Sequence, residues 1–532
     1  MLFFTLVFNS DQLNFSLEQL HSEIFRSLLR PIYFSIVILV CLSLLNAFPA
    51  RWKLKAFAGL SLLLSVTLLV DLWFYRAFRT FPTLSTLSVY RNLSFPLDQV
   101  ASFLRWSDLA LFLDLALLVP ARHALTLSGP TGPRRLALQG SVFTALFFLV
   151  APVADHVIGS KAAKEPFSIF DPVSTSIMMT PLGYHALDLL TLARNAGSHY
   201  VRLSADDRSR IAGWLQENQE KRAPGPMHGL LAGRNLLIIQ VESLESFMLD
   251  RTVNGVPITP CLNALKRQGL YFSEFHEQVH LGVSSDADLM TNSSVLPIRH
   301  QPTFCAFPTA TLPSLPRILG QNGYATTSIH PDKGSLWNVR QGHMNLGFGR
   351  ILDSANFDCT DSFGMGLSDA SYFAQVEPLV KAMKEPFYTF MVTQSSHLPF
   401  EPPDYVRELP LGPDLDREVM GGYFQSVHYT DKHLGLFLER LRRGGVLDRT
   451  VVVITGDHQG VHKYCKQEIH QSSQFQPWWE EKERRIPLLI LAKGLEPREF
   501  GMHAGQVDLM PTLLGLLGVD PGEWGARMMG RN

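Results

Sequence analysis

The sequence predicts two unlike parts: a bundle of membrane-spanning α-helices, followed by an α/β domain built on a mainly parallel sheet. Long apolar segments almost free of charge are confined to the first part of the 532-residue chain. Beyond residue 235, short apolar runs alternate with amphipathic stretches, as in a parallel sheet with helices on both faces. We therefore expect a transmembrane domain over 1–155, connecting helices and a linker over 156–234, and an extracytoplasmic domain over 235–525.

Four segments of the first part are candidate membrane spans. About 20 mostly apolar residues cross a bilayer, and the ranges 31–48, 56–74 and 136–154 meet this requirement with at most one acidic residue each. The range 107–121 is a weaker candidate, because Asp108 and Asp114 would need partners in the protein or the headgroup region.

The loop charges predict the orientation of these spans. Basic residues follow the first span and lie between the third and fourth, so both loops are expected in the cytoplasm and everything after the fourth span outside. The same count puts the N-terminus outside, unless an earlier span is missing from the start of this sequence.

The balance of charges and the positions of the cysteines bear on the partners and the disulfides of the protein. The 47 Lys and Arg residues balance 48 Asp and Glu residues, which argues against nucleic acid as a partner. Cys261, Cys305, Cys359 and Cys465 fall in the part expected outside, where disulfides persist. We favour a Cys305–Cys359 disulfide, with free buried thiols as the alternative.

The second part carries the signals of a parallel α/β fold. The range 258–269 predicts a helix with Pro260 in its first turn, and the ranges 187–193 and 207–222 predict helices in the connecting stretch. Apolar runs predict strands over 235–241, 325–329, 387–392, 450–455 and 486–492.

Two of these strands end in residues suited to a metal. Glu242 follows the first strand, and Asp457-His458 follows the run at 450–455. Ligands of parallel α/β sheets bind beyond the carboxyl ends of strands. Two carboxylates and one imidazole suit Zn²⁺ or Mn²⁺.

With these residues in view, the chain resembles the lipoteichoic acid synthase family, membrane-anchored phosphoglycerol transferases of the alkaline phosphatase and sulfatase superfamily. In the membrane part DLWFYRAFRTF (71–81) and SDLALFLD (107–114) are similar to the family's spans, and the family's additional N-terminal span suggests that this sequence starts within or after it. The matching motifs of the second part are QVESLESF (240–247), GVSSDADLMTNS (282–293), HPDKGSLWN (330–338), QSSHLPF (394–400), TGDHQG (455–460) and AGQVDLMPTLL (504–514).

The resemblance implies a metal centre and a nucleophile. Glu242, Asp457 and His458 match the family's metal ligands, and Ser284 stands where the family has its catalytic Thr, itself a ligand. Metal coordination activates a hydroxyl, whether of Ser or Thr. Ser285 is the competing nucleophile; with Asp288 it also fits a helix-capping signature.

The resemblance also implies a substrate wall of His330, Asp332 and Trp337, with His397 hydrogen-bonding a phosphoryl oxygen or protonating the leaving group. Val339 occupies the position of a family Arg, and Arg340 is expected to replace the lost cation. Val283 and Leu336 replace a family Lys and Phe. His503 is a weak further candidate near the metal, with a structural role as the alternative.

These matches predict metal-dependent transfer of phosphoglycerol, or a similar headgroup, from a phospholipid to a hydroxyl acceptor through a covalent phosphoserine. We expect one divalent metal, Mn²⁺ before Zn²⁺ or Mg²⁺, and phosphatidylglycerol as the donor. The acceptor would be a glycan or a teichoic-acid-like hydroxyl. The enzyme would be a multi-pass protein of the bacterial inner membrane, with its catalytic domain periplasmic or otherwise outside.

Three other functions remain open at this stage. A phosphoethanolamine transferase acting on lipid A or a glycan uses the same chemistry on another headgroup. A sulfatase or phosphodiesterase is less favoured, since the chain lacks the Cys/Ser-x-Pro-Ser-Arg motif that sulfatases modify. A non-catalytic envelope protein would lack the metal.

Overall fold

The computed structural model describes residues 48–78, 81–82, 105–113, 115–116, 172–195, 204–217, 225–299, 302–364, 366–482, 484–520, 522 and 528–531. Contacts group residues 1–201 into one unit and residues 202–532 into a second, and each is described by itself. The candidate span 136–154, residues 31–47 of the first span, and residues 114 and 117–121 of the span 107–121 lie outside the described residues.

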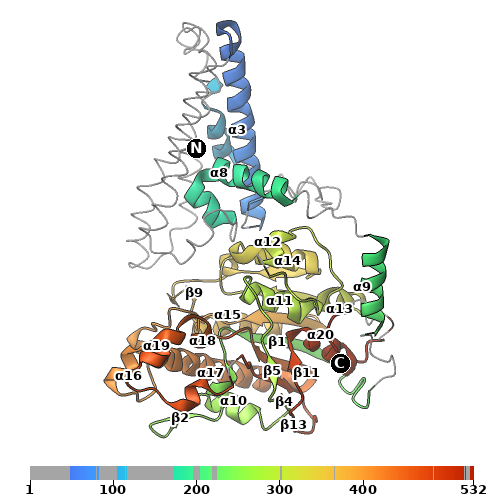
Figure 1. Ribbon diagram of the computed structural model, residues 1–532, viewed down its shortest axis with the longest axis vertical. Helices are drawn as coiled ribbons and strands as arrows, with labels where there is room; N and C mark the ends of the chain where they lie inside the picture. Colours follow the sequence, from blue (N-terminus) through green and yellow to red (C-terminus); the bar gives the residue numbers. More distant parts are fainter. Residues whose placement is uncertain are drawn as a thin grey trace. The chain divides into compact units, whose positions relative to one another are not determined.

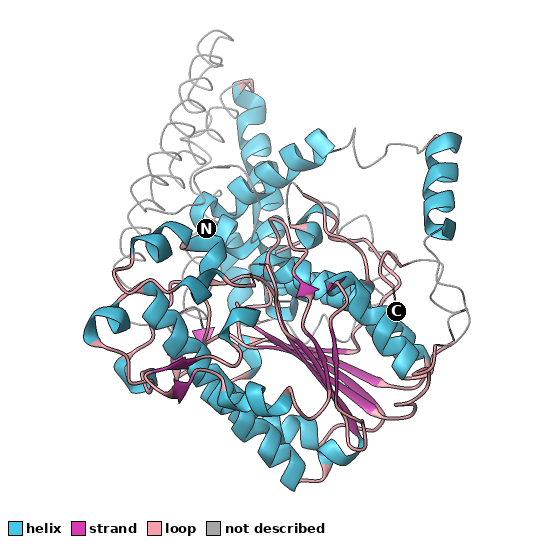
Figure 2. Cartoon of the chain, turned by 60° about the horizontal axis from the view of Figure 1, so that its bottom comes forward, coloured by secondary structure: helices cyan, strands magenta, loops and turns pink. Residues whose placement is uncertain are grey.

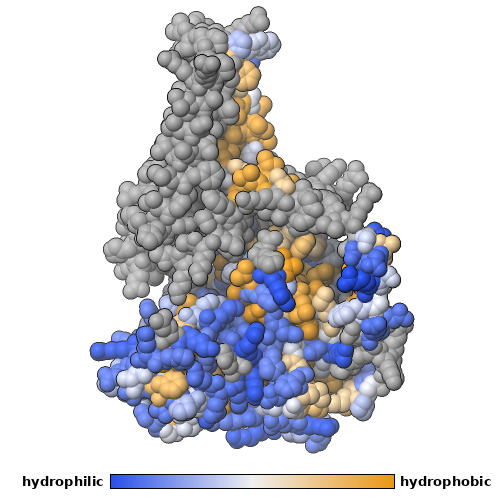
Figure 3. All heavy atoms as spheres, viewed as in Figure 1, coloured by the Kyte–Doolittle hydropathy of each residue, from blue (hydrophilic) through white to orange (hydrophobic). Residues whose placement is uncertain are grey.

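Helix α3 (Ala50–Phe78) dominates the described part of the first unit (Figure 1). Its segment Trp52–Tyr75 is the one helix among the described residues that is long and apolar enough to cross a membrane. It contains the predicted span 56–74. Leu62, Leu63 and Val66 on this helix are exposed, as expected for side chains that face lipid. Figure 3 shows hydrophobic residues along α3.

Two acidic side chains of the first unit find partners. Asp71 of α3 is buried and contacts His185 Nε2 at 3.0 Å, on helix α8 (Pro172–Asn195). Asp108 accepts a hydrogen bond from Trp73 Nε1 at 3.3 Å. Both contacts match the expectation that acids in apolar segments face protein. They also place α8 in the same unit as α3, beyond residue 155.

The weakest predicted span differs from an ordinary α-helix. Trp106–Phe112 forms the 3₁₀ helix η2, and the Asp108 carboxylate accepts from the backbone N–H of Arg105 at its start. In the connecting stretch, α9 (Ala205–Glu217) begins at Ser204, whose hydroxyl accepts from the N–H of Asp207. Helix α9 confirms the predicted polar helix over its described residues; residues 218–222 of the predicted range lie outside them.

An eight-stranded sheet forms the second unit (Figure 2). All pairings are parallel except the two made by β12, so the predicted mainly parallel sheet is confirmed. The five predicted strands all form. In spatial order the strands are β13 (Arg498–Phe500), β4 (Leu270–Phe272), β12 (Leu488–Leu491), β11 (Thr450–Gly456), β1 (Asn235–Val241), β10 (Phe387–Val392), β6 (Ala325–Ile329) and β7 (Arg350–Leu352).

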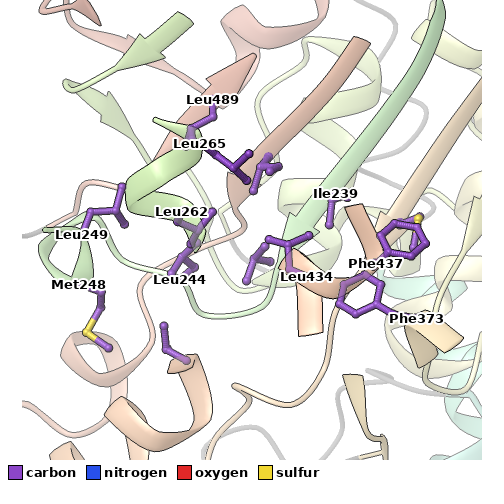
Figure 4. Close-up of a cluster of buried hydrophobic side chains, with 14 of the residues drawn as sticks. Ile239, Leu244, Met248, Leu249, Leu262, Leu265, Phe373, Leu434, Phe437 and Leu489 are labelled. Atoms are coloured by element: carbon purple, nitrogen blue, oxygen red, sulfur yellow. The ribbon is translucent and has the colours of Figure 1, made fainter. Parts of the chain in front are cut away.

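The sheet lies between two layers of helices, as its continuous apolar strands predicted. Strand β1 is fully buried, and its residues alternate between two hydrophobic clusters. Leu237 and Ile239 pack with α10 (Pro260–Leu265), α15 (Asp369–Lys381) and α17 (Val419–Arg443); part of this cluster is drawn in Figure 4. Leu236 and Ile238 pack with α11 (Ser284–Ser293), α13 (Leu315–Gln321) and α20 (Gln506–Leu516).

Shorter elements complete the second unit. The small strands are β2 (Thr252–Val253), β3 (Val256–Pro257), β5 (Phe275–His276), β8 (Ser362–Phe363), β9 (Gly366–Leu367) and β14 (Ala504–Gly505). The short α-helices are α12 (Thr303–Ala306), α14 (Val339–Leu346), α16 (Pro413–Arg417), α18 (Val461–Tyr464) and α19 (Lys466–Gln471). The 3₁₀ helices are η4 (Ser246–Met248), η5 (Leu336–Asn338), η6 (Ser354–Asn356), η7 (Asp404–Val406), η8 (Val446–Arg449) and η9 (Pro477–Glu480).

The favoured disulfide does not form. Cys359 has a free thiol that lies against the backbone carbonyls of Ser354 and Phe357, and Cys261 is also free. The Cys305–Cys359 pairing was therefore wrong, because spacing along the chain carries no information on which cysteines meet in space.

Candidate active site

Four neighbouring parallel strands bring the candidate residues to one edge of the sheet. The strands β11, β1, β10 and β6 lie side by side in this order and run in the same direction. Asp457, Glu242 and His330 directly follow β11, β1 and β6, and His397 lies five residues beyond β10. The carboxyl edge of the sheet therefore gathers residues that are far apart in the sequence.

Glu242, Asp457 and His458 form a buried group whose donor atoms all lie within 4.8 Å of one another. The Nε2 atom of His458 is 3.2 Å from Asp457 Oδ2 and 3.5 Å from Glu242 Oε1. The His458 Nδ1 atom lies 2.7 Å from the carbonyl oxygen of Gln459. Because a carbonyl only accepts, Nδ1 carries the hydrogen and Nε2 presents its lone pair to the two carboxylates.

Unsatisfied atoms in this group fit a divalent cation. Asp457 Oδ1 accepts from the backbone N–H groups of Ser243 and His458, both at 2.7 Å, whereas Asp457 Oδ2 is buried without a hydrogen-bond partner. Burial and the neighbouring Asp457 carboxylate raise the pKa of Glu242 well above its usual value. A bound cation would give Asp457 Oδ2 a partner and would relieve the repulsion between the carboxylates of Glu242 and Asp457. The residues present therefore fit a metal.

Ser284 lies against this group. Its Oγ atom is 3.1 Å from His458 Nε2 and 3.4 Å from Glu242 Oε2. The hydroxyl of Ser285 instead donates to the carbonyl of Gly282 at 2.7 Å. The backbone therefore presents the hydroxyl of Ser284, and not that of Ser285, to the candidate ligands.

A strained turn sets the position of Ser284 at the start of α11. Val283 has φ of 46°, a conformation that is unusual for a β-branched residue. At Gly282 an added Cβ would lie 2.1 Å from Asp286 Oδ1, so glycine is required. Asp286 Oδ2 accepts from the backbone N–H groups of His280 and Gly282.

The capping signature of Ser285 and Asp288 was wrong. Asp286 binds the backbone at this turn, as described above. The Asp288 Oδ1 atom instead accepts from Gln240 Nε2 at 2.8 Å, inside the protein. The pattern failed because the backbone before α11 donates to Asp286 in the first turn of the helix, and not to Asp288.

Two further cationic or imidazole groups lie near the candidate ligands. The His397 Nδ1 atom contacts the carbonyl oxygen of Leu398 at 2.6 Å. Burial lowers the pKa of His458, and the neighbouring Lys463 and His397 add smaller effects in the same direction. Lys463 of α18 is half-buried; burial lowers its pKa, and the carboxylates of Glu277 and Asp457 oppose this effect. Sequence reasoning missed Lys463, although it follows Asp457-His458 by only a few residues.

The predicted substrate wall is only partly assembled at the metal group. The Asp332 carboxylate is close enough to contribute to the raised pKa of Glu242. The ring nitrogens of His330 face two carboxylates of the protein: Nε2 is 3.4 Å from Asp288 Oδ2, and Nδ1 is 3.7 Å from Asp332 Oδ1. Trp337 is half-buried, with φ of 53°.

Arg340 and His503 have other contacts. The Arg340 guanidinium donates to Asp353 Oδ2 at 2.8 Å, so the cation expected to replace the missing Arg is engaged in an ion pair. His503 lies with His276 and Glu274 in a separate group near the surface.

Comparison with known families agrees with this arrangement. The model of the sulfatase family matches residues 234–519, more than half of the chain. The model of the lipoteichoic acid synthase N-terminal domain matches residues 1–198. The chain belongs to the lipoteichoic acid synthase family, within the alkaline phosphatase and sulfatase superfamily. It is accordingly a transferase of the lipoteichoic acid synthase type.

Individual relatives cover most of this lipoteichoic acid synthase family member. It is 27% identical to lipoteichoic acid synthase 2 of Bacillus subtilis over 89% of this chain and 73% of the relative. It is 29% identical to lipoteichoic acid synthase 1 of the same organism, over 86% and 72%. Among solved structures, the lipoteichoic acid synthase LtaP from Listeria monocytogenes is similar with a TM-score of 0.54 and 29% identity, over 61% of this chain and 80% of that one.

Proposed function

We propose that this protein transfers phosphoglycerol from a membrane phospholipid, phosphatidylglycerol first, to a hydroxyl acceptor, with Ser284 as the nucleophile. The observation that carries the proposal is the position of the Ser284 hydroxyl between His458 Nε2 and Glu242 Oε2, at the edge of a buried group with an orphaned carboxylate oxygen. Relatives named as lipoteichoic acid synthases support the substrate class.

Transfer through Ser284 takes two displacements at phosphorus. In the first, a bond forms between Ser284 Oγ and phosphorus while the bond to the diacylglycerol oxygen breaks. The proton lost from the serine is balanced by the proton that the departing oxygen gains. In the second, an acceptor hydroxyl attacks the phosphoserine, and Ser284 regains its proton.

A divalent metal belongs to this reaction. Glu242, Asp457, His458 and the Ser284 hydroxyl are the residues that would hold it. When bound, it would supply positive charge that activates the hydroxyl and neutralises the phosphoryl oxygens. Carboxylate and hydroxyl oxygens with one imidazole favour Mn²⁺, with Zn²⁺ and Mg²⁺ as the alternatives.

Residues around the metal group supply binding and proton transfer. Lys463 is a half-buried cation among the carboxylates, suited to attract an anionic headgroup. His397 is the candidate proton donor to the departing oxygen, because its Nδ1 is held by a carbonyl and its Nε2 is left for the substrate. Asp332 and Trp337 are the proposed headgroup contacts.

The membrane anchor follows from the substrate. A lipid donor, and a glycan or teichoic-acid-like acceptor at the cell surface, favour an enzyme held at the bilayer. We propose a bacterial inner-membrane protein with several spans over 1–155, a connecting region over 156–234, and a catalytic domain over 235–525 outside the cytoplasm. Helix α3 is the described span of this anchor.

Mass spectrometry of the active-site peptide tests the proposal. Full-length protein in liposomes with Mn²⁺ is given phosphatidylglycerol or phosphatidylethanolamine, and the Ser284 peptide is analysed after rapid quenching. We expect a glycerophosphoryl adduct with phosphatidylglycerol alone. A phosphoethanolamine adduct would show that the transferred headgroup is phosphoethanolamine. An adduct on Ser285, or no adduct with either lipid while transfer proceeds, would overturn the covalent mechanism through Ser284.

A further inference from the structure

A second group of metal-ligating side chains lies inside the protein, one helical turn along α11 from Ser284. It consists of Asp288 on α11, His330 after β6 and His343 on α14. All three residues are buried, and one donor atom from each lies within 4.8 Å of the other two. None of the three is among the candidate catalytic ligands Glu242, Asp457, His458 and Ser284, whereas His330 is also the residue that the family resemblance assigned to the substrate wall.

The separations within this group suit a shared ion. Asp288 Oδ2 is 3.4 Å from His330 Nε2 and 3.2 Å from His343 Nε2. Ligand atoms about 2.0–2.1 Å from a tetrahedral ion lie about 3.3 Å from one another. The contacts in the catalytic group have the same range, from 3.1 to 3.5 Å.

Outer contacts hold these side chains in a ligating orientation. The His343 Nδ1 atom is 2.7 Å from Ser328 Oγ, and the second oxygen of Asp288 accepts from Gln240 at 2.8 Å. The Nδ1 atom of His330 faces Asp332 at 3.7 Å. Metal-binding histidines are commonly oriented in this way, with the other ring nitrogen held by a polar group.

The His330 Nε2 atom has no hydrogen-bond partner although it is buried. If Nε2 carried a hydrogen, it would face Asp288 Oδ2 at 3.4 Å without completing a hydrogen bond. If it presented a lone pair, that lone pair would face the Asp288 carboxylate and be repelled. A cation between them removes both difficulties, because each lone pair then becomes a ligand.

We propose that Asp288, His330 and His343 bind a second divalent cation, of the zinc class. Two imidazoles with one carboxylate are a ligand set that Zn²⁺ favours. The ion would tie α11, α14 and the end of β6 together directly behind Ser284.

Zinc stoichiometry of the full-length protein in detergent tests this site. After equilibration with Zn²⁺ and removal of loose metal, we expect two zinc ions per chain in the unaltered protein. His343→Gln and Asp457→Asn should each retain one, and the double variant none. A single equivalent in the unaltered protein, unchanged by His343→Gln, would overturn the second site without touching the proposed function. The second site would also be overturned if the unaltered protein held two zinc ions per chain and Asp457→Asn lost both.

His276→Gln is the matched control. His276, His503 and Glu274 form the other histidine group near the surface, where Arg485 already contacts Glu274 at 2.6 Å. We expect His276→Gln to keep both zinc ions. If this variant lost one zinc ion, the second ion would belong to the group near the surface, which would contradict the proposal.

X-ray absorption counts the imidazole ligands of the bound zinc and requires no substitution in the proposed second site. In Asp457→Asn the remaining zinc should show two imidazole ligands, whereas the catalytic group offers only one. A spectrum with one imidazole or none would contradict the proposal. This measurement also covers the case in which His343→Gln fails to fold.

Discussion

The Oγ atom of Ser284 lies 3.1 Å from the Nε2 atom of His458, although 174 positions separate the two residues in the chain. The contact exists because Ser284 opens α11 and His458 follows β11. It joins the proposed nucleophile to the proposed metal group, and the first two predictions below depend on it.

Replacing Ser284 with Ala should lower phosphoglycerol transfer by more than about three decades, because the lost hydroxyl is the one that contacts both Glu242 and His458 among the described side chains. Transfer from labelled phosphatidylglycerol measures the loss. Ser285→Ala is the matched control: it loses only a hydrogen bond to a backbone carbonyl and should stay within about tenfold of normal. Similar losses in both variants would contradict the assignment of Ser284.

Replacing Asp457 with Asn should abolish stabilisation by Mn²⁺, since the orphaned oxygen becomes a neutral amide. A ligand at 100 times its Kd stabilises the folded state by about 2.7 kcal/mol. Thermal unfolding with and without Mn²⁺ measures this. A melting temperature that rises with Mn²⁺ equally in the variant and the unaltered protein would remove Asp457 from the metal site.

Replacing Gly282 with Ala should destabilise the protein by roughly 2 kcal/mol or more and reduce transfer, because the new Cβ would overlap Asp286. Chemical denaturation and the transfer assay measure the two effects. Gly320→Ala, on helix α13, is the control, since nothing lies within 4 Å of its added Cβ; it should be neutral or stabilising by up to about 1 kcal/mol. Equal destabilisation would refute the packing argument.

Asp431 should make stability depend on pH. Burial raises its pKa to about 7, although its carboxylate accepts from the backbone N–H groups of Cys261 and Leu262. The folded state therefore binds the proton more tightly than the unfolded state, and this contribution to stability falls as pH rises from about 4 to about 7.

Asp431→Asn removes that contribution. Between pH 4 and pH 8 the free energy of unfolding of the unaltered protein should fall by on the order of 4 kcal/mol more than that of the variant. Urea titrations across this range measure the difference. Parallel pH profiles would show that Asp431 is not the titrating group.

The central strands were predictable because each is buried on both faces. β1, β10 and β11 therefore appear in the sequence as uninterrupted apolar runs. The three-residue strands β4, β7 and β13 were missed, since each is too short to form an apolar run, and Arg498–Phe500 pairs at the sheet edge. The order of the strands in the sheet could not be predicted either, because an apolar run does not specify which strands pair with it.

Some residues of the candidate site could be predicted from the sequence, and others could not. Glu242, Asp457 and His458 were predictable as polar residues at strand ends. Lys463 and Asp288 were not, since their roles arise from contacts with side chains more than 40 positions away, such as Glu277 and Gln240. Arg340 was predicted from its position as a substrate contact, whereas its ion pair with Asp353 could not be predicted from the sequence.

The place of β11 in the sheet has a consequence for biosynthesis. Strand β11 is the last of the four central strands to be translated, and it carries Asp457 and His458 to the side of β1. A chain that has emerged only to residue 449 therefore holds Ser284 and Glu242 but lacks most of the metal group. With Ser284 as the proposed nucleophile, the proposed transfer cannot begin before β11 has joined the sheet.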